Sequence, residues 1–340
     1  NIGIGSGSMG GAVVTGNENI AVGSHQTLDA LTSGIQNIAV GSKAGSAINT
    51  GRYNTTIGFQ SGLSLTTASG SVAIGTSAMA VATTGNNNIA IGNSALNAGN
   101  ITGDNNIGIG TICGDALTSG TDNILIGNLA GIDITTSSRN IFIGLQSGHD
   151  LVGGEGGNVG LGPFSNDNLT TGKDCTALGY SAKPSATNAI NQTMVGKGAT
   201  GQANHAVVLG DDDVTKVYMS QDGDAEMYAN GTINTSDERL KENINDTDLG
   251  LEFVNKLRPV SYKFKKDKQS NKLKYGIIAQ EVQEVLKETN NEDFAGITNK
   301  GEYLGADYVQ FIAPLMKAVQ ELSEQNKVLE KRLEELEGNS

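Results

Sequence analysis

The stretch "NIAIG" at residues 88–92 decides the architecture, because versions of it recur along the chain. Two apolar residues, Ile89 and Ile91, are separated by one small residue, which is the spacing of a β-strand with both larger side chains on one face. Ala90 falls on the other face, and the glycine that follows permits a turn with positive φ. The expected unit is therefore a short strand that ends at a glycine.

The unit recurs at steps of 17 or 18 residues, except for a last step of 14. One such unit is too small to bury its apolar face alone, so a period this regular indicates a stack of units. We expect a β-solenoid with Ile over Ile and Asn over Asn. The closing glycines are Gly5, Gly23, Gly41, Gly58, Gly75, Gly92, Gly110, Gly127, Gly144, Gly162, Gly179, Gly196 and Gly210.

The rest of each unit is interpreted as turn material, for example "TTGNNN" at residues 83–88. Large side chains are then too few to fill a wide core within one chain. Several chains that share one apolar axis would solve this problem.

The two cysteines fit the repeat. Cys113 occupies a position that is often Ala, and Cys175 occupies a position that is usually Asn. They lie about four repeats apart, which at ~4.8 Å per rung places them roughly 19 Å apart. A disulfide requires Cα atoms within about 7 Å, so both are predicted to be structural and free.

Charge and composition exclude several classes of function. The net charge is −13, which argues against a nucleic-acid partner and an anionic membrane surface. No apolar run reaches the ~18 residues of a membrane span, so no membrane insertion is expected. No signal peptide is recognised, and because the chain begins inside a repeat we expect a fragment of a longer protein.

No metal or cofactor site is predicted. His25, His149 and His205 share no metal-ligand spacing. The acidic runs at residues 210–214 and 221–226 are interpreted as solvated turns.

The chain changes character at "TSDERLKENI", residues 235–244, which holds five charged residues in ten. Beyond it, "LRPVSYKFKK" predicts a strand with Val260, Tyr262 and Phe264 on one side. "KYGIIAQEVQEVLKET" predicts a buried strand over residues 275–279, followed by an amphipathic helix.

The last helix carries heptads and predicts a coiled coil over residues 307–337. On their own, Leu at one core position and a lone Asn at the other favour two strands. The two core positions are Ile312, Val319, Asn326 and Leu333, and Leu315, Leu322, Leu329 and Leu336.

Four blocks carry a resemblance to a known family: "SDERLKENI", "LRPVSYKFK", "YGIIAQEVQEV" and "DYVQFIAPLMKAVQEL". Residues 236–340 resemble the C-terminal intramolecular chaperone of endosialidase-type tailspikes and tail fibres. Residues 1–210 resemble the β-structured shafts of phage fibres and the heads of trimeric autotransporter adhesins. The resemblance implies that three chains assemble and that the chaperone then cuts itself away with a Ser/Lys dyad.

The dyad of this family falls on Ser236 and Lys241, with Asp237 and Arg239 as supporting motif residues. The implied cut lies between Thr235 and Ser236. A serine hydroxyl needs a base to take its proton. A lysine serves as that base only when neutral, which burial or a nearby positive charge such as that of Arg239 favours.

The spacing of the dyad raises a geometric problem. Five residues of a regular helix turn about 500°, so Ser236 and Lys241 would not share a helical face. The pair needs an irregular turn after Ser236, or a lysine from a neighbouring chain. An alternative interpretation of "TSDE" is a helix capping box, with Thr235 as the cap and Glu238 three residues later.

The repeat pattern and the family resemblance together imply a mainly β, trimeric protein in three parts. Residues 1–210 form a β-solenoid shaft, residues 211–235 a β connector, and residues 236–340 a small α/β chaperone and autocatalytic serine endopeptidase that ends in the coiled coil. The expected function is a tail fibre or tailspike tip of a virion. Its shaft would bind a host receptor, either a glycan or an outer-membrane component. The alternatives are a cell-surface adhesin and a capsule depolymerase with the same chaperone.

Overall fold

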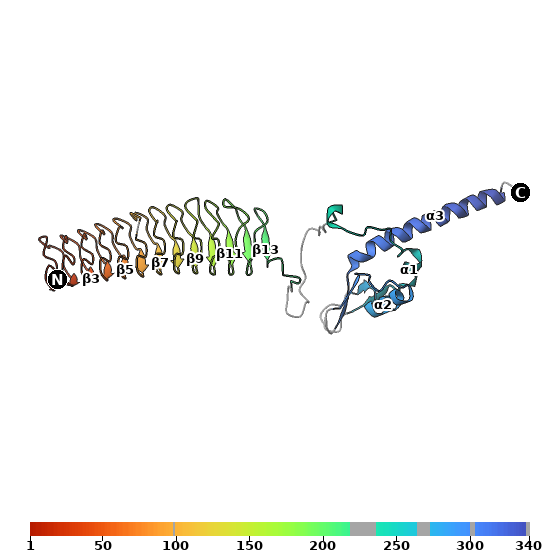
Figure 1. Cartoon of the computed structure of the whole chain (residues 1–340), viewed down its shortest axis with the longest axis horizontal. Coiled ribbons are helices and arrows are strands. Elements are labelled where there is room, and N and C mark those ends of the chain that lie inside the picture. The colour runs from red at the N-terminus through yellow and green to blue at the C-terminus, as the bar shows by residue number, and fades with distance from the viewer. Residues whose placement is uncertain (98, 218–235, 264–272, 300–302, 338–340) are drawn as a thin grey trace. The chain divides into compact units, whose positions relative to one another are not determined.

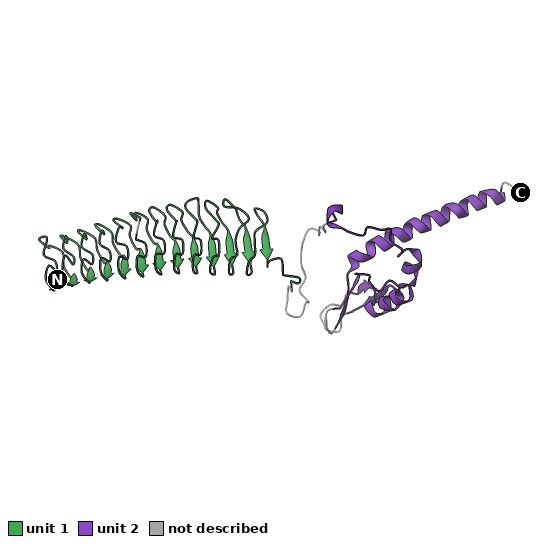
Figure 2. Cartoon of the chain, viewed as in Figure 1, with its two compact units in different colours: residues 1–227 green, residues 228–340 purple. Residues whose placement is uncertain are grey.

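The chain divides into two compact units, Asn1–Met227 and Tyr228–Ser340 (Figure 2). The first is a parallel β-solenoid, and the second is a small mixed domain that ends in a long helix (Figure 1), so the predicted mainly β fold class is confirmed. The computed structural model describes residues 1–97, 99–217, 236–263, 273–299 and 303–337.

Thirteen strands of three residues form one parallel sheet, in which each strand pairs with the next along the chain. Each strand ends at the residue before a closing glycine, as the repeat predicts. The pairing superposes like positions, for example Ala73 on Ala90 and Ile74 on Ile91. The strands are β1 (Ile2–Ile4), β2 (Ile20–Val22), β3 (Ile38–Val40), β4 (Thr55–Ile57), β5 (Val72–Ile74), β6 (Ile89–Ile91), β7 (Ile107–Ile109), β8 (Ile124–Ile126), β9 (Ile141–Ile143), β10 (Val159–Leu161), β11 (Thr176–Leu178), β12 (Thr193–Val195) and β13 (Val207–Leu209).

The middle residue of each strand points into the solenoid. Leu125 and Phe142 are fully buried there, and Ala or Gly occupies this position on most of the other rungs. Neighbouring positions adjust to the size of this side chain. A Cβ placed on Gly131 would lie 2.7 Å from Cδ2 of Leu125, so a large strand residue is matched by a glycine beside it.

The loops supply a second buried column, so the interpretation of the loops as turn material alone is wrong. Most loops place one Leu or Ile in the interior. Together with the middle strand residues, these side chains fill the interior of a single chain. No shared axis is needed to complete it, contrary to the prediction. These residues are Leu31, Ile48, Leu65, Ile101, Leu117, Ile134, Leu151 and Leu169.

Buried asparagines form a ladder along the solenoid, as predicted from the repeat. Asn106 donates from its side-chain amide to Oδ1 of Asn88 at 3.0 Å and to the carbonyl of Gly120 at 2.9 Å. Its own Oδ1 accepts from the backbone and side-chain amides of Asn123 at 3.1 and 3.0 Å. Each rung is therefore tied to the next by side chains as well as by the sheet. Ser71 and Cys175 take the asparagine position on two rungs.

The closing glycines are required by close approach of the backbone. Gly58 has a φ of 129°, and a Cβ on it would lie 2.6 Å from the carbonyl oxygen of Gly75. Any other residue would clash with the next rung. The glycines recur regularly in the sequence because each rung requires one at the point where the next rung packs against it.

Beyond β13, residues 211–217 contain a turn and no strand, and Asp212 and Asp213 are exposed. The rest of the predicted connector, including the acidic run at residues 221–226 and Thr235, lies outside the described residues.

Before its long last helix, the second unit is built from short elements. The 3₁₀ turn η1 (Glu238–Leu240) precedes α1 (Leu251–Lys256), and the hairpin strands β14 (Val260–Tyr262) and β15 (Lys274–Gly276) precede α2 (Ala279–Glu288). The strands β16 (Ile297–Asn299) and β17 (Leu304–Ala306) form a second antiparallel pair before η2 (Tyr308–Phe311) and α3 (Ile312–Glu337).

The predicted buried strand at residues 275–279 is corrected by the structure. The strand ends at Gly276, and Tyr275 is 78% exposed because its side of the two-stranded sheet is uncovered. The predicted strand around Val260 and the helix through Val282 are confirmed. Phe264 lies outside the described residues.

Aromatic rings form the core of the second unit. Phe294 packs edge-on against Phe311, with ring centroids 5.1 Å apart, and Phe253 lies 6.0 Å from Phe294. Val282 and Leu286 of α2 complete the core. The apolar heptad residues of α3 are mostly exposed in the single chain. No helix in the described parts of the chain is both long and apolar enough to cross a bilayer.

Candidate self-processing site

The segment after Ser236 folds into the irregular turn that the dyad requires. Asp237 caps η1 by accepting a hydrogen bond from the amide of Arg239 at 3.0 Å. The amide of Lys241 closes the turn by donating to the carbonyl of Glu238 at 3.0 Å. Asp237 and Lys241, on either side of the turn, have extended backbone conformations. The cap of this turn is therefore Asp237, rather than the Thr235 of the capping-box interpretation.

This turn brings Ser236 and Lys241 of the same chain together. Nζ of Lys241 donates to Oγ of Ser236 at 2.8 Å. A 3₁₀ turn has three residues per turn, so the chain reverses over fewer residues than in an α-helix. The side chains that flank it can then meet despite their spacing of five. This distance is within the range in which a base takes a proton from a hydroxyl.

The other two motif residues pair with each other. Nε of Arg239 lies 3.0 Å from Oδ1 of Asp237, and one terminal nitrogen of Arg239 lies 2.6 Å from Oδ2. This hydrogen-bonded ion pair lowers the pKa of Asp237 and raises that of Arg239. Because the carboxylate offsets the guanidinium charge, Arg239 is tied to the turn and exerts less electrostatic influence on its surroundings.

The site is open to solvent in the single chain. Ser236, Arg239 and Lys241 are exposed, and Leu240 and Ile244 are 73% and 61% exposed. Leu240 lies within the turn and Ile244 follows it by four residues, and burial of two such apolar side chains would be favourable. Thr235, the residue on the other side of the predicted cut, lies outside the described residues.

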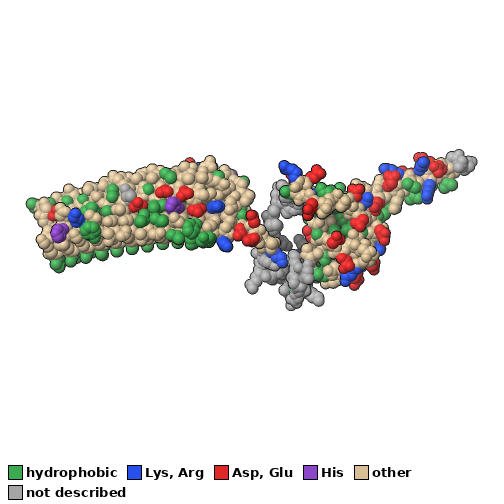
Figure 3. Space-filling view, viewed as in Figure 1, with side chains coloured by type: hydrophobic (Ala, Val, Ile, Leu, Met, Phe, Trp, Pro, Cys, Tyr) green, Lys and Arg blue, Asp and Glu red, His purple; other side chains and the backbone are tan. Residues whose placement is uncertain are grey.

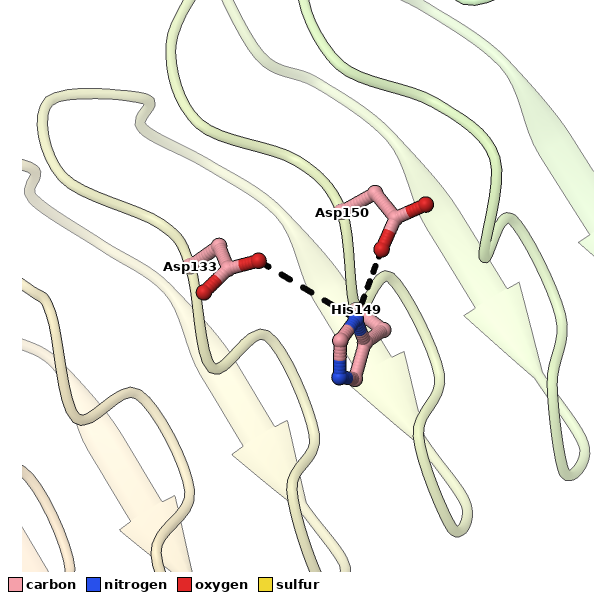
Figure 4. Close-up of side chains that lie close together, drawn as sticks. All are labelled: Asp133, His149 and Asp150. Atoms are coloured by element: carbon pink, nitrogen blue, oxygen red, sulfur yellow. Dashed lines mark hydrogen bonds and ion pairs between the residues drawn. The ribbon is translucent and has the colours of Figure 1, made fainter.

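A second cluster of ionisable side chains lies on the shaft, and the sequence analysis missed it (Figure 4). Nδ1 of His149 is 2.6 Å from Oδ1 of Asp150 and 4.0 Å from Oδ2 of Asp133. Asp133 and Asp150 are 17 residues apart, so the repeat length itself would have placed them on adjacent rungs. This cluster is partly exposed, so the contact between His149 and Asp150 is a hydrogen-bonded pair that solvent can reach. Neither His25 nor His205 belongs to it.

Both cysteines are free and fully buried, as predicted. Burial raises the pKa of the Cys113 thiol to about 12 and also raises that of Cys175. Since the thiolate is the reactive form, neither thiol is suited to redox chemistry in the folded shaft.

Comparison with known proteins finds one similarity, in the first half of the second unit. Residues 236–290 match the family Peptidase_S74, described as the chaperone of endosialidase. No curated protein and no solved structure matches the chain. The match begins at Ser236, the residue whose hydroxyl contacts Lys241.

Residues 236–290 are therefore similar to a chaperone domain of the self-cleaving peptidase kind. A chaperone domain of this kind, joined to a repetitive β-solenoid, points to a protein of the tail-fibre or tailspike type.

Proposed function

We propose that this chain is the tip of a trimeric tail fibre or tailspike, assembled by a C-terminal chaperone that cuts itself away between Thr235 and Ser236. The observation that carries the proposal is the contact between Lys241 and Ser236 at the first residue of the family match. Ser236 is the nucleophile and Lys241 of the same chain is the base.

The reaction rearranges the peptide bond that precedes Ser236. Nζ of neutral Lys241 takes the proton of Oγ, which attacks the carbonyl carbon of Thr235. The bond between that carbon and the amide nitrogen of Ser236 breaks, and the nitrogen receives the proton. The resulting ester between Thr235 and Oγ is hydrolysed by water, which releases Ser236 as a new N-terminus.

The solvent exposure of the dyad supports coupling of this reaction to assembly. A lysine is a poor base while water surrounds it, and burial favours its neutral form. Packing of another copy on the exposed side chains of Leu240 and Ile244 would remove water from the site. The free chain would then be slow to cut, and the assembled chain fast.

The number of copies is proposed to be three. The heptads of α3 alone favour two, but the chaperone domain resembles that of trimeric fibres. The mature shaft is proposed to lie in a virion and to bind a glycan or an outer-membrane component of the host. A glycan array with the purified shaft tests the first ligand. Incubation with capsular polysaccharide, followed by an assay for new reducing ends, distinguishes binding from depolymerase activity.

The role of Lys241 is tested by Lys241→Arg. Arginine keeps the positive charge and hydrogen-bond donors but does not lose its proton at any ordinary pH. Cutting should therefore disappear on a denaturing gel, while light scattering still finds assembled chains. The matched control is Lys331→Arg on the exposed face of α3, which should cut like the unaltered chain. Cutting of Lys241→Arg at the normal rate would remove Lys241 from the mechanism.

A further inference from the structure

The outer face of the shaft sheet carries two columns of side chains, one from the first and one from the third residue of each strand. The first-residue column is interrupted by Thr55, Thr176 and Thr193. The third-residue column is apolar on every rung, and neither column contains a charged residue. The third-residue column is Ile4, Val22, Val40, Ile57, Ile74, Ile91, Ile109, Ile126, Ile143, Leu161, Leu178, Val195 and Leu209.

This column is substantially exposed in the single chain. Ile91 and Ile109 are each 36% exposed, and Leu209 is 48% exposed. Hydrophobic side chains accordingly form a nearly continuous row along one edge of the shaft (Figure 3). The interior does not need these residues, since the middle strand residues and the loop leucines already fill it.

The area of this row exceeds what a lone soluble protein normally exposes. Seven of the thirteen residues are at least 36% exposed and the other six are partly exposed. Together they form an apolar strip on the order of 1,000 Å², against a few hundred Å² for a typical largest patch. A standard specific interface buries about 800 Å² per partner. The strip is therefore large enough to be an interface along the whole shaft.

A second copy of the chain fits this strip better than an unrelated surface. The strip repeats at the rise of one strand per rung, so a parallel copy in register meets it with the same spacing at every rung. The strictly apolar part of the strip is one residue wide. A row this narrow can lie along a rotation axis and meet its own counterpart in each copy. The exposed leucines of α3, such as Leu322 and Leu329, likewise favour parallel copies of this chain.

We propose that copies of this chain associate through the third-residue column, which lies along the axis of the assembled shaft. The inference rests on the proposed function for the number of copies, but the face that they share is assigned from the shaft alone. It places the shared apolar axis outside the solenoid of each chain, between complete solenoids.

The test uses the geometry of a rotation axis. A residue can contact its own counterpart only when it lies close to that axis. The full chain with Ile91→Cys should form a disulfide between copies under mild oxidation, because disulfides require Cα atoms within about 7 Å. The control is Thr84→Cys, an exposed loop position of the same repeat. The native thiols of Cys113 and Cys175 are buried and provide the background.

A non-reducing gel should show about ten-fold more covalent dimer of the shaft for Ile91→Cys than for Thr84→Cys, given that distance requirement. Ile109→Cys, in the same column, should behave like Ile91→Cys and guards against a local folding defect. Light scattering is measured in parallel. An assembled protein without this cross-link overturns the proposed face and leaves the proposed function intact. A monomer overturns both, and a monomer that floats with phosphatidylcholine vesicles would assign the strip to a lipid surface instead.

Discussion

The two units of the chain differ in how they bury asparagine and leucine. In the shaft, Asn106 is fully buried with its amide bonded to the rungs on both sides, and Leu117 is buried inside the same chain. In the second unit, Asn326 and Leu329 lie on an exposed helix. The shaft thus pairs nearly all of its buried polar side chains and buries its loop leucines within one chain, whereas the apolar heptad residues of α3 are exposed in the single chain.

The two units therefore differ in what they can contribute to the alignment of copies. A stack of nearly identical rungs gains stability from each neighbour, but nothing in a repeated rung identifies which rung of another copy it should meet. The second unit has a non-repeating aromatic core and a helix whose heptads have one alignment. These features fit the proposal that the second unit aligns copies while the shaft forms and is then cut away.

The largest effect is expected from charges on α3. Leu322→Glu combined with Leu329→Glu should keep chains monomeric, because like charges at core heptad positions oppose helix association. If cutting requires assembly, the variant should remain uncut on a denaturing gel while light scattering reports a monomer. Lys331→Glu, on the same helix outside the heptad core, should assemble and cut normally. Efficient cutting in the proven monomer would separate the peptidase from assembly.

A charge on the outer face of the shaft sheet should also weaken assembly, this time through the first unit. Ile91→Asp would place a carboxylate in the strip that copies share, and an unpaired buried charge costs several kcal/mol. The yield of heat-resistant oligomer should fall sharply, and Thr84→Asp should leave it unchanged. A normal yield from Ile91→Asp would show that this column faces solvent in the assembled protein.

A smaller effect is expected from the asparagine ladder. Asn106→Ala leaves the amide of Asn123 and the carbonyl of Gly120 without their side-chain partner, which should cost about 2 kcal/mol of unfolding free energy. Asn326→Ala on α3 should change the free energy of unfolding of the single chain by less than about 0.5 kcal/mol. Equal losses measured by denaturant unfolding would contradict the contrast between the two units.

The smallest effect concerns the native thiols. Because burial raises the pKa of Cys113 from 9.0 to about 12, its thiolate fraction at pH 8 falls about a thousand-fold. Native chain should resist maleimide and label only on unfolding, whereas Thr84→Cys should label at once. The same shift means that stability is full below pH 9 and falls as pH rises above it, since the unfolded thiol ionises first. Fast labelling of the native cysteines would show that the rungs open readily.

The rungs could be predicted from the sequence because each constraint repeats. Gly58 must be glycine for the backbone of the next rung to approach, and Asn106 must stack on Asn88, so both appear at fixed intervals. The direction of the apolar pair could not be predicted. Alternation shows that Ile89 and Ile91 share a face, but not that the smaller Ala90 faces the interior.

The residues of the candidate site could be predicted from the sequence, but the conformation of the turn that brings them together could not. The motif identified Ser236 and Lys241, and their spacing indicated an irregular turn. Which turn forms depends on the cap that Asp237 provides and on its pairing with Arg239, both of which are local side-chain geometry. The cluster around His149 has no local sequence signature, because Asp133 lies one repeat before His149 and Asp150 and comes next to them only through the stacking of adjacent rungs.

The fragments that the full chain produces test self-cleavage at Ser236 directly. The unaltered chain should yield two pieces, residues 1–235 and residues 236–340, and N-terminal sequencing of the smaller piece should begin at Ser236. Ser236→Ala should assemble and remain a single chain in intact-mass analysis, because no hydroxyl is left to attack the carbonyl of Thr235. A Ser236→Ala chain that still splits after Thr235 would contradict self-cleavage by this dyad.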